Sequence, residues 1–346
     1  MIDFFVSNFD LNFIWFLLIG VLFTGYVILD GFDLGVGALH LFTKTDHDRR
    51  LMINSIGPVW DGNEVWLVTG GGALFAAFPD VYASVFSGFY LAFMLLLLCL
   101  IFRAVAIEFR SKFNSQWVRE CWDISFSVSS FLSALLIGVA MGNLIWGIKL
   151  SSPKILSMSL LDLLHPYALG MGVLTVALFM MHGAIYLVLK TESELQAQAR
   201  RWFHYAMVFF AISFFCMSVI TLLYVPHVNE HFKQNVLWLI IPFLGILAIA
   251  NIPREIYHGR EFIAFLSSCF AISALTSLAG IGLFPEMVHC INNPNWHMTI
   301  YNSASSSQTL AIMLIIAIIG VPIVLTYTAC IYYIFRGKVK LSKDSY

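Results

Sequence analysis

Charged residues are what this sequence has least of. Its 346 residues include 19 Lys and Arg and 20 Asp and Glu, or 11%, while 60% are hydrophobic. Ordinary soluble domains carry about 25% charged residues. So little charge cannot cover a water-facing surface, which excludes a soluble enzyme and a disordered protein. The net charge of -1 also gives no basic face of the kind that nucleic-acid-binding proteins need.

Cysteine motifs and a secretion signal are also missing. The six cysteines form no CxxC or CxxCH pair, and most lie in apolar runs, where a thiol behaves as a small hydrophobic group. We therefore expect neither a disulfide framework nor a metal site. Residues 1–10 contain Asp3 and Asp10 but no Lys or Arg, so the basic start of a signal peptide is absent.

Histidines inside apolar runs are equally scarce. Of ten histidines only His182 lies well inside such a run, whereas a haem held between helices needs buried axial ligands, usually His with a second His or a Met. A histidine satisfied within the core is therefore the favoured interpretation, and a haem-carrying cytochrome is the less favoured one. Glycine-rich phosphate loops and Ser/His/Asp or Cys/His nucleophile arrangements are absent too.

What the sequence does contain is a series of long apolar runs, each near the roughly 20 residues that span a bilayer as a helix. Nine such runs predict an all-α polytopic membrane protein. The expected helices are about 12–38, 57–78, 82–107, 123–146, 165–189, 202–225, 235–253, 261–284 and 309–335. No loop between them is long enough to fold alone, so residues 1–346 read as a single transmembrane domain.

The basic residues predict the orientation of these helices. With the N-terminus outside, 16 Lys and Arg fall in inner segments, and only Lys149, Lys154 and Lys233 fall in outer ones. Cytoplasmic loops carry such an excess of basic residues. Removing one helix would reverse every later loop, so the sequence favours nine helices with the N-terminus out and the C-terminus in.

Most charges at membrane depth lie in the first three predicted helices, near their inner ends. Asp30 and Asp33 form one i, i+3 pair and therefore share a helix face. Asp61 and Glu64 form another, and the third helix ends with Arg103 and Glu108.

An ionisable residue at this depth is a functional hypothesis by default, and clustered carboxylates suit proton entry from the cytoplasm. The alternative is that these charges only fix helix ends at the headgroups. Gly31, Gly35 and Gly37 indicate close helix packing. Trp60 is expected to anchor the second helix, with contact to a redox ligand as the alternative.

Four segments resemble a known family. GYVILDGFDLGVGAL at 25–39, RRLMINSIGPVWDGNEVWLVTGGGALFAAFP at 49–79 and FSGFYLAFMLLLLCLIFRAVAIEFRSK at 86–112 look like subunit II of the cytochrome bd-type quinol oxidases, cyanide-insensitive variants included. SASSSQTLAIMLIIAIIGVPIVLTYTACIYYIF at 303–335 resembles the last helix of that family. The likeness covers about the first third and the last tenth of the chain.

The resemblance implies a terminal oxidase in the bacterial cytoplasmic membrane that oxidises membrane quinol and reduces O2 to water. Proton motive force then arises from vectorial chemistry without pumping. Haem b and haem d belong to subunit I, and subunit II is its haem-free partner, with two four-helix bundles plus a peripheral helix. Small single-helix accessory subunits, membrane lipid and a structural quinone are further expected partners. No cofactor ligand is assigned to this chain.

The resemblance also implies roles for residues. Asp61 and Glu108 match carboxylates on a proton route toward subunit I, with Glu108 standing where some members have Asp. Asp30, Asp33, Glu64, Arg103 and Trp60 form the expected supporting cluster. A departure lies at Tyr301-Asn302-Ser303, where some members have Trp-Asp-Ala. The alternative function is a proton-coupled secondary transporter, which would need inverted repeats and helices broken at the membrane midplane.

Overall fold

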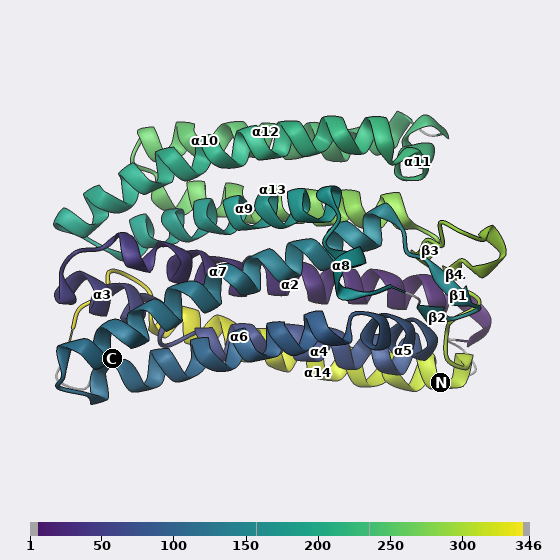
Figure 1. Ribbon diagram of the computed structural model, residues 1–346, viewed down its shortest axis with the longest axis horizontal. Helices are drawn as coiled ribbons and strands as arrows, with labels where there is room; N and C mark the ends of the chain where they lie inside the picture. Colours follow the sequence, from purple (N-terminus) through teal and green to yellow (C-terminus); the bar gives the residue numbers. More distant parts are fainter. Residues whose placement is uncertain (1–5, 157, 235, 342–346) are drawn as a thin grey trace.

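The computed structural model describes residues 6–156, 158–234 and 236–341, most of them in helices. The long helices run side by side along the longest axis (Figure 1). They are α2 (Leu11–Leu39), α4 (Trp60–Ala77), α6 (Tyr90–Phe109), α7 (Gln116–Trp146), α9 (Pro166–Lys190), α10 (Ser193–Tyr224), α12 (Ile240–Tyr257), α13 (Glu261–Leu283) and α14 (Ser307–Ile334).

Shorter elements connect them at the two ends. The short helices are α3 (Asp46–Ile56), α5 (Pro79–Gly88), α8 (Leu160–Leu163), α11 (Glu230–Gln234), η1 (His40–Phe42), η2 (Arg110–Lys112), η3 (Pro226–Asn229), η4 (Val236–Leu239) and η5 (Pro294–Trp296). The strands β1 (Leu150–Ser152) and β2 (Ile155–Leu156), and β3 (Glu286–Val288) and β4 (Met298–Thr299), form two antiparallel pairs. The strands lie at the end where α2 begins, and α3 lies at the opposite end (Figure 1).

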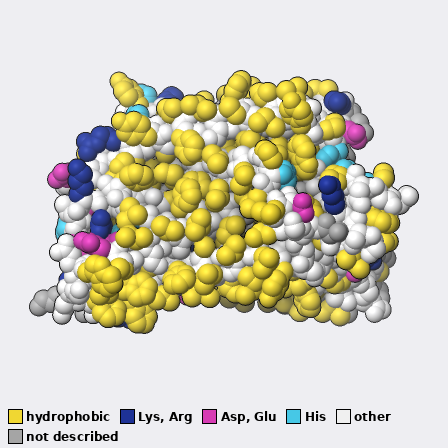
Figure 2. Space-filling view, in the orientation of Figure 1, with side chains coloured by type: hydrophobic (Ala, Val, Ile, Leu, Met, Phe, Trp, Pro, Cys, Tyr) yellow, Lys and Arg dark blue, Asp and Glu magenta, His cyan; other side chains and the backbone are white. Residues whose placement is uncertain are grey.

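Eight of the long helices are long and apolar enough to cross a membrane, namely all of them except α4. Figure 2 shows hydrophobic side chains over the middle of one face, with Lys, Arg, Asp and Glu toward its two ends. The chain is therefore a helical, multi-pass membrane protein. Helix α4 is less apolar because Asp61, Asn63 and Glu64 occupy its first turns. The count of nine spans, their orientation and the two-bundle arrangement stay predictions.

The boundaries differ from the predicted ones where helices pass beyond their apolar runs. The predicted helix 123–146 begins at Gln116, and the predicted helix 202–225 begins at Ser193, because polar helical turns precede both apolar runs. The predicted helix 82–107 is divided at Phe89 into α5 and α6, directly after Ser87 and Gly88.

In Figure 1, α9 and α13 overlap in one layer and α2 and α7 in the next, between α10 and α12 on one side and α4, α6 and α14 on the other. Glycines let α2 and α9 touch through their backbones. A Cβ atom on Gly35 would lie 1.9 Å from the carbonyl oxygen of Phe179, and one on Gly183 would lie 2.5 Å from the carbonyl carbon of Gly35. This contact is the close packing that small residues allow in membrane helices.

Candidate functional site

A fully buried arginine joins three helices near the inner ends expected from the sequence. Arg103 on α6 is 0% exposed, and its Nη1 lies 2.7 Å from Oδ1 of Asp30 on α2. Its Nη2 lies 3.3 Å from Oε1 of Glu64 on α4. A buried charge is tolerated when a partner compensates it. The forked guanidinium does this for carboxylates of two different helices.

One turn along α2, Asp33 belongs to a second set of contacts. Its Oδ2 accepts a hydrogen bond of 2.7 Å from Nδ2 of Asn63, which also donates to the carbonyl of Leu29 at 3.2 Å. The hydroxyl of Tyr332 on α14 donates to Oδ1 of Asn63 at 2.9 Å. Asn63 and Tyr332 were not among the predicted site residues. Asn63 lies inside the quoted WDGNEVW segment, whereas nothing in the sequence links Tyr332 to it.

The cluster has hydrogen-bonding capacity left over. Asp30 Oδ2, Asp33 Oδ1 and the hydroxyl of Tyr26 are buried, and within the described residues they find no protein hydrogen-bond partner. Most buried polar atoms bind a protein group or an ordered water. Tyr26 lies one helical turn before Asp30 on α2. The two carboxylate oxygens are therefore suited to binding water or a proton, and the Tyr26 hydroxyl is suited to binding water.

The remaining predicted residues surround this cluster. Asp61 is exposed in the first turn of α4, three residues before Glu64, and makes none of the hydrogen bonds or ion pairs found within residues 6–156, 158–234 and 236–341. Glu108 is part-buried, five residues beyond Arg103 on α6. Trp60 is buried in the hydrophobic core. The structure thus gathers Asp30, Asp33, Glu64 and Arg103, and places Asp61 toward the surface.

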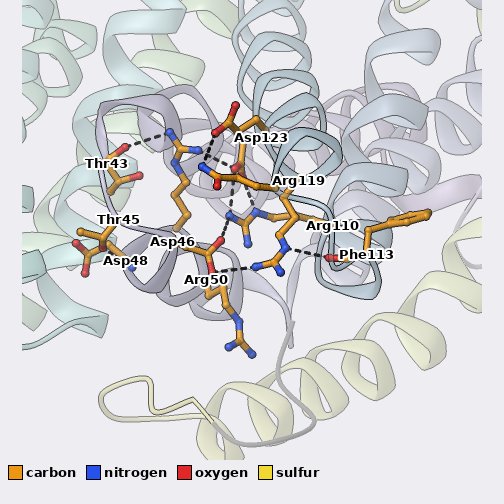
Figure 3. A network of polar contacts seen from close by, with 12 residues as sticks. Thr43, Thr45, Asp46, Asp48, Arg50, Arg110, Phe113, Arg119 and Asp123 are labelled. Atoms are coloured by element: carbon orange, nitrogen blue, oxygen red, sulfur yellow. Dashed lines mark hydrogen bonds and ion pairs between the residues drawn. The ribbon is translucent and has the colours of Figure 1, made fainter.

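A second buried network, absent from the sequence-based predictions, centres on Asp123 at the start of α7 (Figure 3). Its Oδ1 lies 2.5 Å from Nε of Arg110 and 2.5 Å from Nε2 of His40, and its Oδ2 lies 2.9 Å from Nη1 of Arg49. Arg110 also pairs with Asp46 at 2.8 Å. The network ties α2, α3, α6 and α7 together at one end of the molecule. The excess of inner basic residues was the one available signal for it.

A third cluster lies at the opposite end, in the β3–β4 segment. Glu286 Oε2 lies 2.6 Å from Nδ1 of His289 and 3.2 Å from Nδ1 of His297. Burial alone would raise the pKa of Glu286, but the hydrogen bond to His289 and the nearby imidazoles lower it overall. Burial lowers the pKa of His297 and so favours its neutral form. One ligand atom from each of the three residues lies within 4.8 Å of the others.

His182 is a satisfied core residue. Its Nδ1 lies 2.8 Å from the hydroxyl of Ser268, and its Nε2 lies 3.0 Å from the carbonyl of Ile28. With both ring nitrogens already hydrogen-bonded, the side chain does not fit the role of an axial haem ligand, which needs a nitrogen lone pair directed at the iron.

Comparisons with known proteins bear on the whole chain. A family model described as cytochrome bd terminal oxidase subunit II matches residues 11–335. The cytochrome bd-I ubiquinol oxidase subunit 2 of Escherichia coli (strain K12) is 36% identical over 361 residues, which cover 95% of each chain. The cytochrome bd ubiquinol oxidase subunit 2 of Bacillus subtilis (strain 168) is 30% identical over 332 residues, which cover 95% of this chain and 97% of that protein.

The fold has a solved counterpart as well. A chain in the structure of bd oxidase from Geobacillus thermodenitrificans superposes with a TM-score of 0.78 at 17% sequence identity. The superposition covers 94% of this chain and 99% of the other. At this identity the likeness shows the shared fold.

Proposed function

The chain belongs to the cytochrome bd terminal oxidase subunit II family, and from this premise we propose that it carries part of the cytoplasmic proton-entry route of a quinol oxidase. The enzyme oxidises membrane quinol and reduces O2 to water in the bacterial cytoplasmic membrane. Protons for water come from the inner side, and those of quinol leave on the outer side, so charge separation needs no pump. Family membership leaves the secondary transporter without support.

The haems of this enzyme, two of type b and one of type d, belong in our proposal to subunit I, where they would pass electrons to O2. The hydrogen-bonded state of both His182 nitrogens supports this division. The present chain then supports subunit I mechanically and feeds it protons. Single-helix accessory subunits, membrane lipid and a structural quinone are further expected partners of the complex.

One observation carries the proposed route, namely that polar side chains continue from an exposed carboxylate to fully buried ones. Asp61 is exposed, and Glu64 follows it on the same face of α4, at the spacing where helix side chains are neighbours. Arg103 connects Glu64 to Asp30. A proton taken up at Asp61 would pass to Glu64 and then to the acceptor atoms around Asp30.

Each residue has its own task in this scheme. Arg103 holds the carboxylates of Asp30 and Glu64 in place through its two ion pairs. Asn63 fixes the carboxylate of Asp33 by donating to it, and the part-buried Glu108 offers a second entrance along α6. From Asp30 and Asp33 the protons leave for the partner subunit.

The test is oxygen uptake by the tagged complex carrying Asp61→Asn, purified in mild detergent. We expect turnover with quinol to fall by about 10²-fold, the lower end of what a positioned proton-transfer group contributes. The b- and d-type bands of the reduced-minus-oxidised spectrum should stay unchanged. The matched control is Glu120→Gln, which removes another exposed carboxylate, on α7, and should keep full turnover.

Two outcomes would contradict the proposal. Unchanged oxygen uptake in the Asp61→Asn complex would remove Asp61 from the route. Loss of the haem bands together with subunit I would make Asp61 a structural residue, because proton transfer alone does not decide assembly.

A further inference from the structure

We propose that Glu286, His289 and His297 form a binding site for a divalent transition-metal ion such as Zn²⁺, at the end of the molecule that carries the β strands. The sequence led us to expect no metal site, because the cysteines form no motif and these histidines fall in a loop. Folding brings the three side chains together, with one ligand atom of each within 4.8 Å of the others.

The β3–β4 hairpin creates this arrangement. Val288 pairs with Met298 across the two strands. His289 directly follows Val288, and His297 directly precedes Met298, so the register places the two imidazoles next to each other. Glu286 begins β3, three residues before His289. Glu286 lies in β3, His289 directly follows it and His297 directly precedes β4, so an ion would join the two sides of this small sheet.

Hydrogen bonding shows that electron-rich atoms converge here. The backbone N–H of Cys290 donates to Nδ1 of His297 at 3.1 Å, so this nitrogen carries no proton, and an ion bound there would displace the Cys290 N–H from its lone pair. The same nitrogen lies 3.2 Å from Oε2 of Glu286. Two acceptor atoms thus face each other with no proton of their own between them. A shared cation stabilises such a pair, and in a metal site it would take the place of the proton between Glu286 and His289.

One of the two distances from Glu286 already suits tetrahedral coordination. Bonds of 2.0–2.2 Å to His nitrogen and carboxylate oxygen place neighbouring ligand atoms about 3.3 Å apart. The distance of 3.2 Å between Glu286 and His297 already matches this value. The 2.6 Å between Glu286 and His289 is a hydrogen-bond distance and must open by about 0.7 Å when a metal replaces the proton.

Neighbouring groups hold the ligands in place. The ring of His289 stacks on His227, with centroids 3.9 Å apart and planes at 7°, and lies 4.6 Å from His297. Nε2 of His227 donates to the carbonyl of Ile145 at 2.9 Å, which fixes that ring in turn. Partners of this kind orient ligands and keep a site formed.

The chemistry of the ligand set defines the ion. Two imidazoles and one carboxylate suit Zn²⁺ and its d-block neighbours, whereas Mg²⁺ and Ca²⁺ prefer oxygen ligands alone. Three protein ligands leave a fourth position for water. The side chains of Glu286, His289 and His297 are 29%, 20% and 18% exposed, so an ion from solution can reach them. The buried Cys290 thiol donates instead to Asn292 and lies outside the set.

The experiment measures zinc bound to the purified complex after dialysis against Zn²⁺ alone. We expect the wild type to bind one equivalent of zinc more than the double variant His289→Gln/His297→Gln. A chelator should remove this additional zinc. Glu286→Gln should weaken binding at least tenfold. The control is His258→Gln, which changes an exposed histidine at the C-terminal end of α12. This variant should still bind one equivalent of zinc. Chromatography and the haem spectrum report whether each variant is folded.

X-ray absorption identifies the ligands. We expect a first shell of nitrogen and oxygen at about 2.0–2.1 Å. A sulfur shell at about 2.3 Å would assign the ion to a cysteine and overturn the proposal. Equal zinc content in the wild type and the double variant would overturn it as well. If the double variant fails to fold, the zinc content and X-ray absorption of the Glu286→Gln variant test the proposal instead. This substitution preserves the shape of the side chain.

Discussion

At the scale of single residues, Arg103 is a charged side chain that needs compensation by its neighbours. It is completely buried, and its charge is compensated by Asp30 and Glu64 on two other helices. A buried pair contributes little net stability while it is intact, but removing one partner leaves an uncompensated charge. The intact arginine therefore adds little to the stability of the fold, but its loss would leave the Asp30 and Glu64 carboxylates without a compensating charge.

Replacing Arg103 should consequently destabilise the protein by about 3–5 kcal/mol. We expect Arg103→Leu to lower the apparent melting temperature in detergent, and a second change, Asp30→Asn, to restore part of the loss because it removes the orphaned charge. The exposed Arg201 on α10 serves as the control, and Arg201→Leu should have little effect. If the double variant is less stable than Arg103→Leu alone, an uncompensated Asp30 charge is not the cause of the instability.

A second residue-scale prediction concerns pH. His165 caps α9, its Nδ1 accepting from the backbone N–H of Ala168 at 3.4 Å, and burial lowers its pKa. In the unfolded chain the ring takes up a proton near its ordinary pKa of about 6.5. The unfolded state therefore binds more protons below that pH, so the folded state loses stability as pH falls through 6.5.

The change His165→Asn keeps a capping side chain but removes the titration. We expect the apparent melting temperature of the variant to fall less between pH 7.5 and pH 5.5 than that of the wild type. Parallel curves for the two proteins would mean that His165 does not contribute to this pH dependence.

At the scale of elements, the contact between α2 and α9 is the closest helix crossing described above. A methyl group on Gly35 would meet the Phe179 carbonyl oxygen at 1.9 Å, so Gly35→Ala forces the helices apart. Overpacking of this kind costs about 1–3 kcal/mol. Gly20→Ala on the same helix is the matched control, because nothing lies within 4 Å of the added carbon.

We expect Gly35→Ala to lower the apparent melting temperature, and Gly20→Ala to leave it unchanged or raise it slightly, since Ala favours a helix over Gly by about 1 kcal/mol. The two variants add the same atom to the same helix, so helix propensity alone cannot explain a difference. Equal melting temperatures would show that α2 and α9 do not depend on their backbone contact.

The elements also show what the sequence could and could not predict. The apolar run at 12–38 was long, and the helix found is Leu11–Leu39. Helix α3 was not predicted, because its polar residues form no apolar run. The division at Phe89 was missed although Ser87 and Gly88 directly precede it. Hydropathy identifies segments that suit the bilayer interior. It therefore misses polar helices outside the bilayer and interruptions of a helix within it.

At the scale of the whole molecule, the same limit applies to the sites. Asp30, Asp33, Glu64 and Arg103 could be predicted because charges are conspicuous in apolar helices. Their partner Tyr332 could not, since an aromatic residue near a helix end is unremarkable and its contact with Asn63 spans 269 positions. The His and Glu cluster of the β3–β4 segment depends on strand register, which a loop sequence does not specify.

The pairing of Asp30 with Arg103 has a consequence for how the protein is made. The arginine leaves the ribosome 73 residues after its partner, when α2 has already been offered to the bilayer. A charged residue costs roughly 2.5–3.5 kcal/mol at the centre of an inserting helix, and Asp30 and Asp33 lie nearer its inner end. Helix α2 is therefore synthesised before Arg103 can pair with Asp30. Its residence in the membrane becomes secure only when α6 arrives.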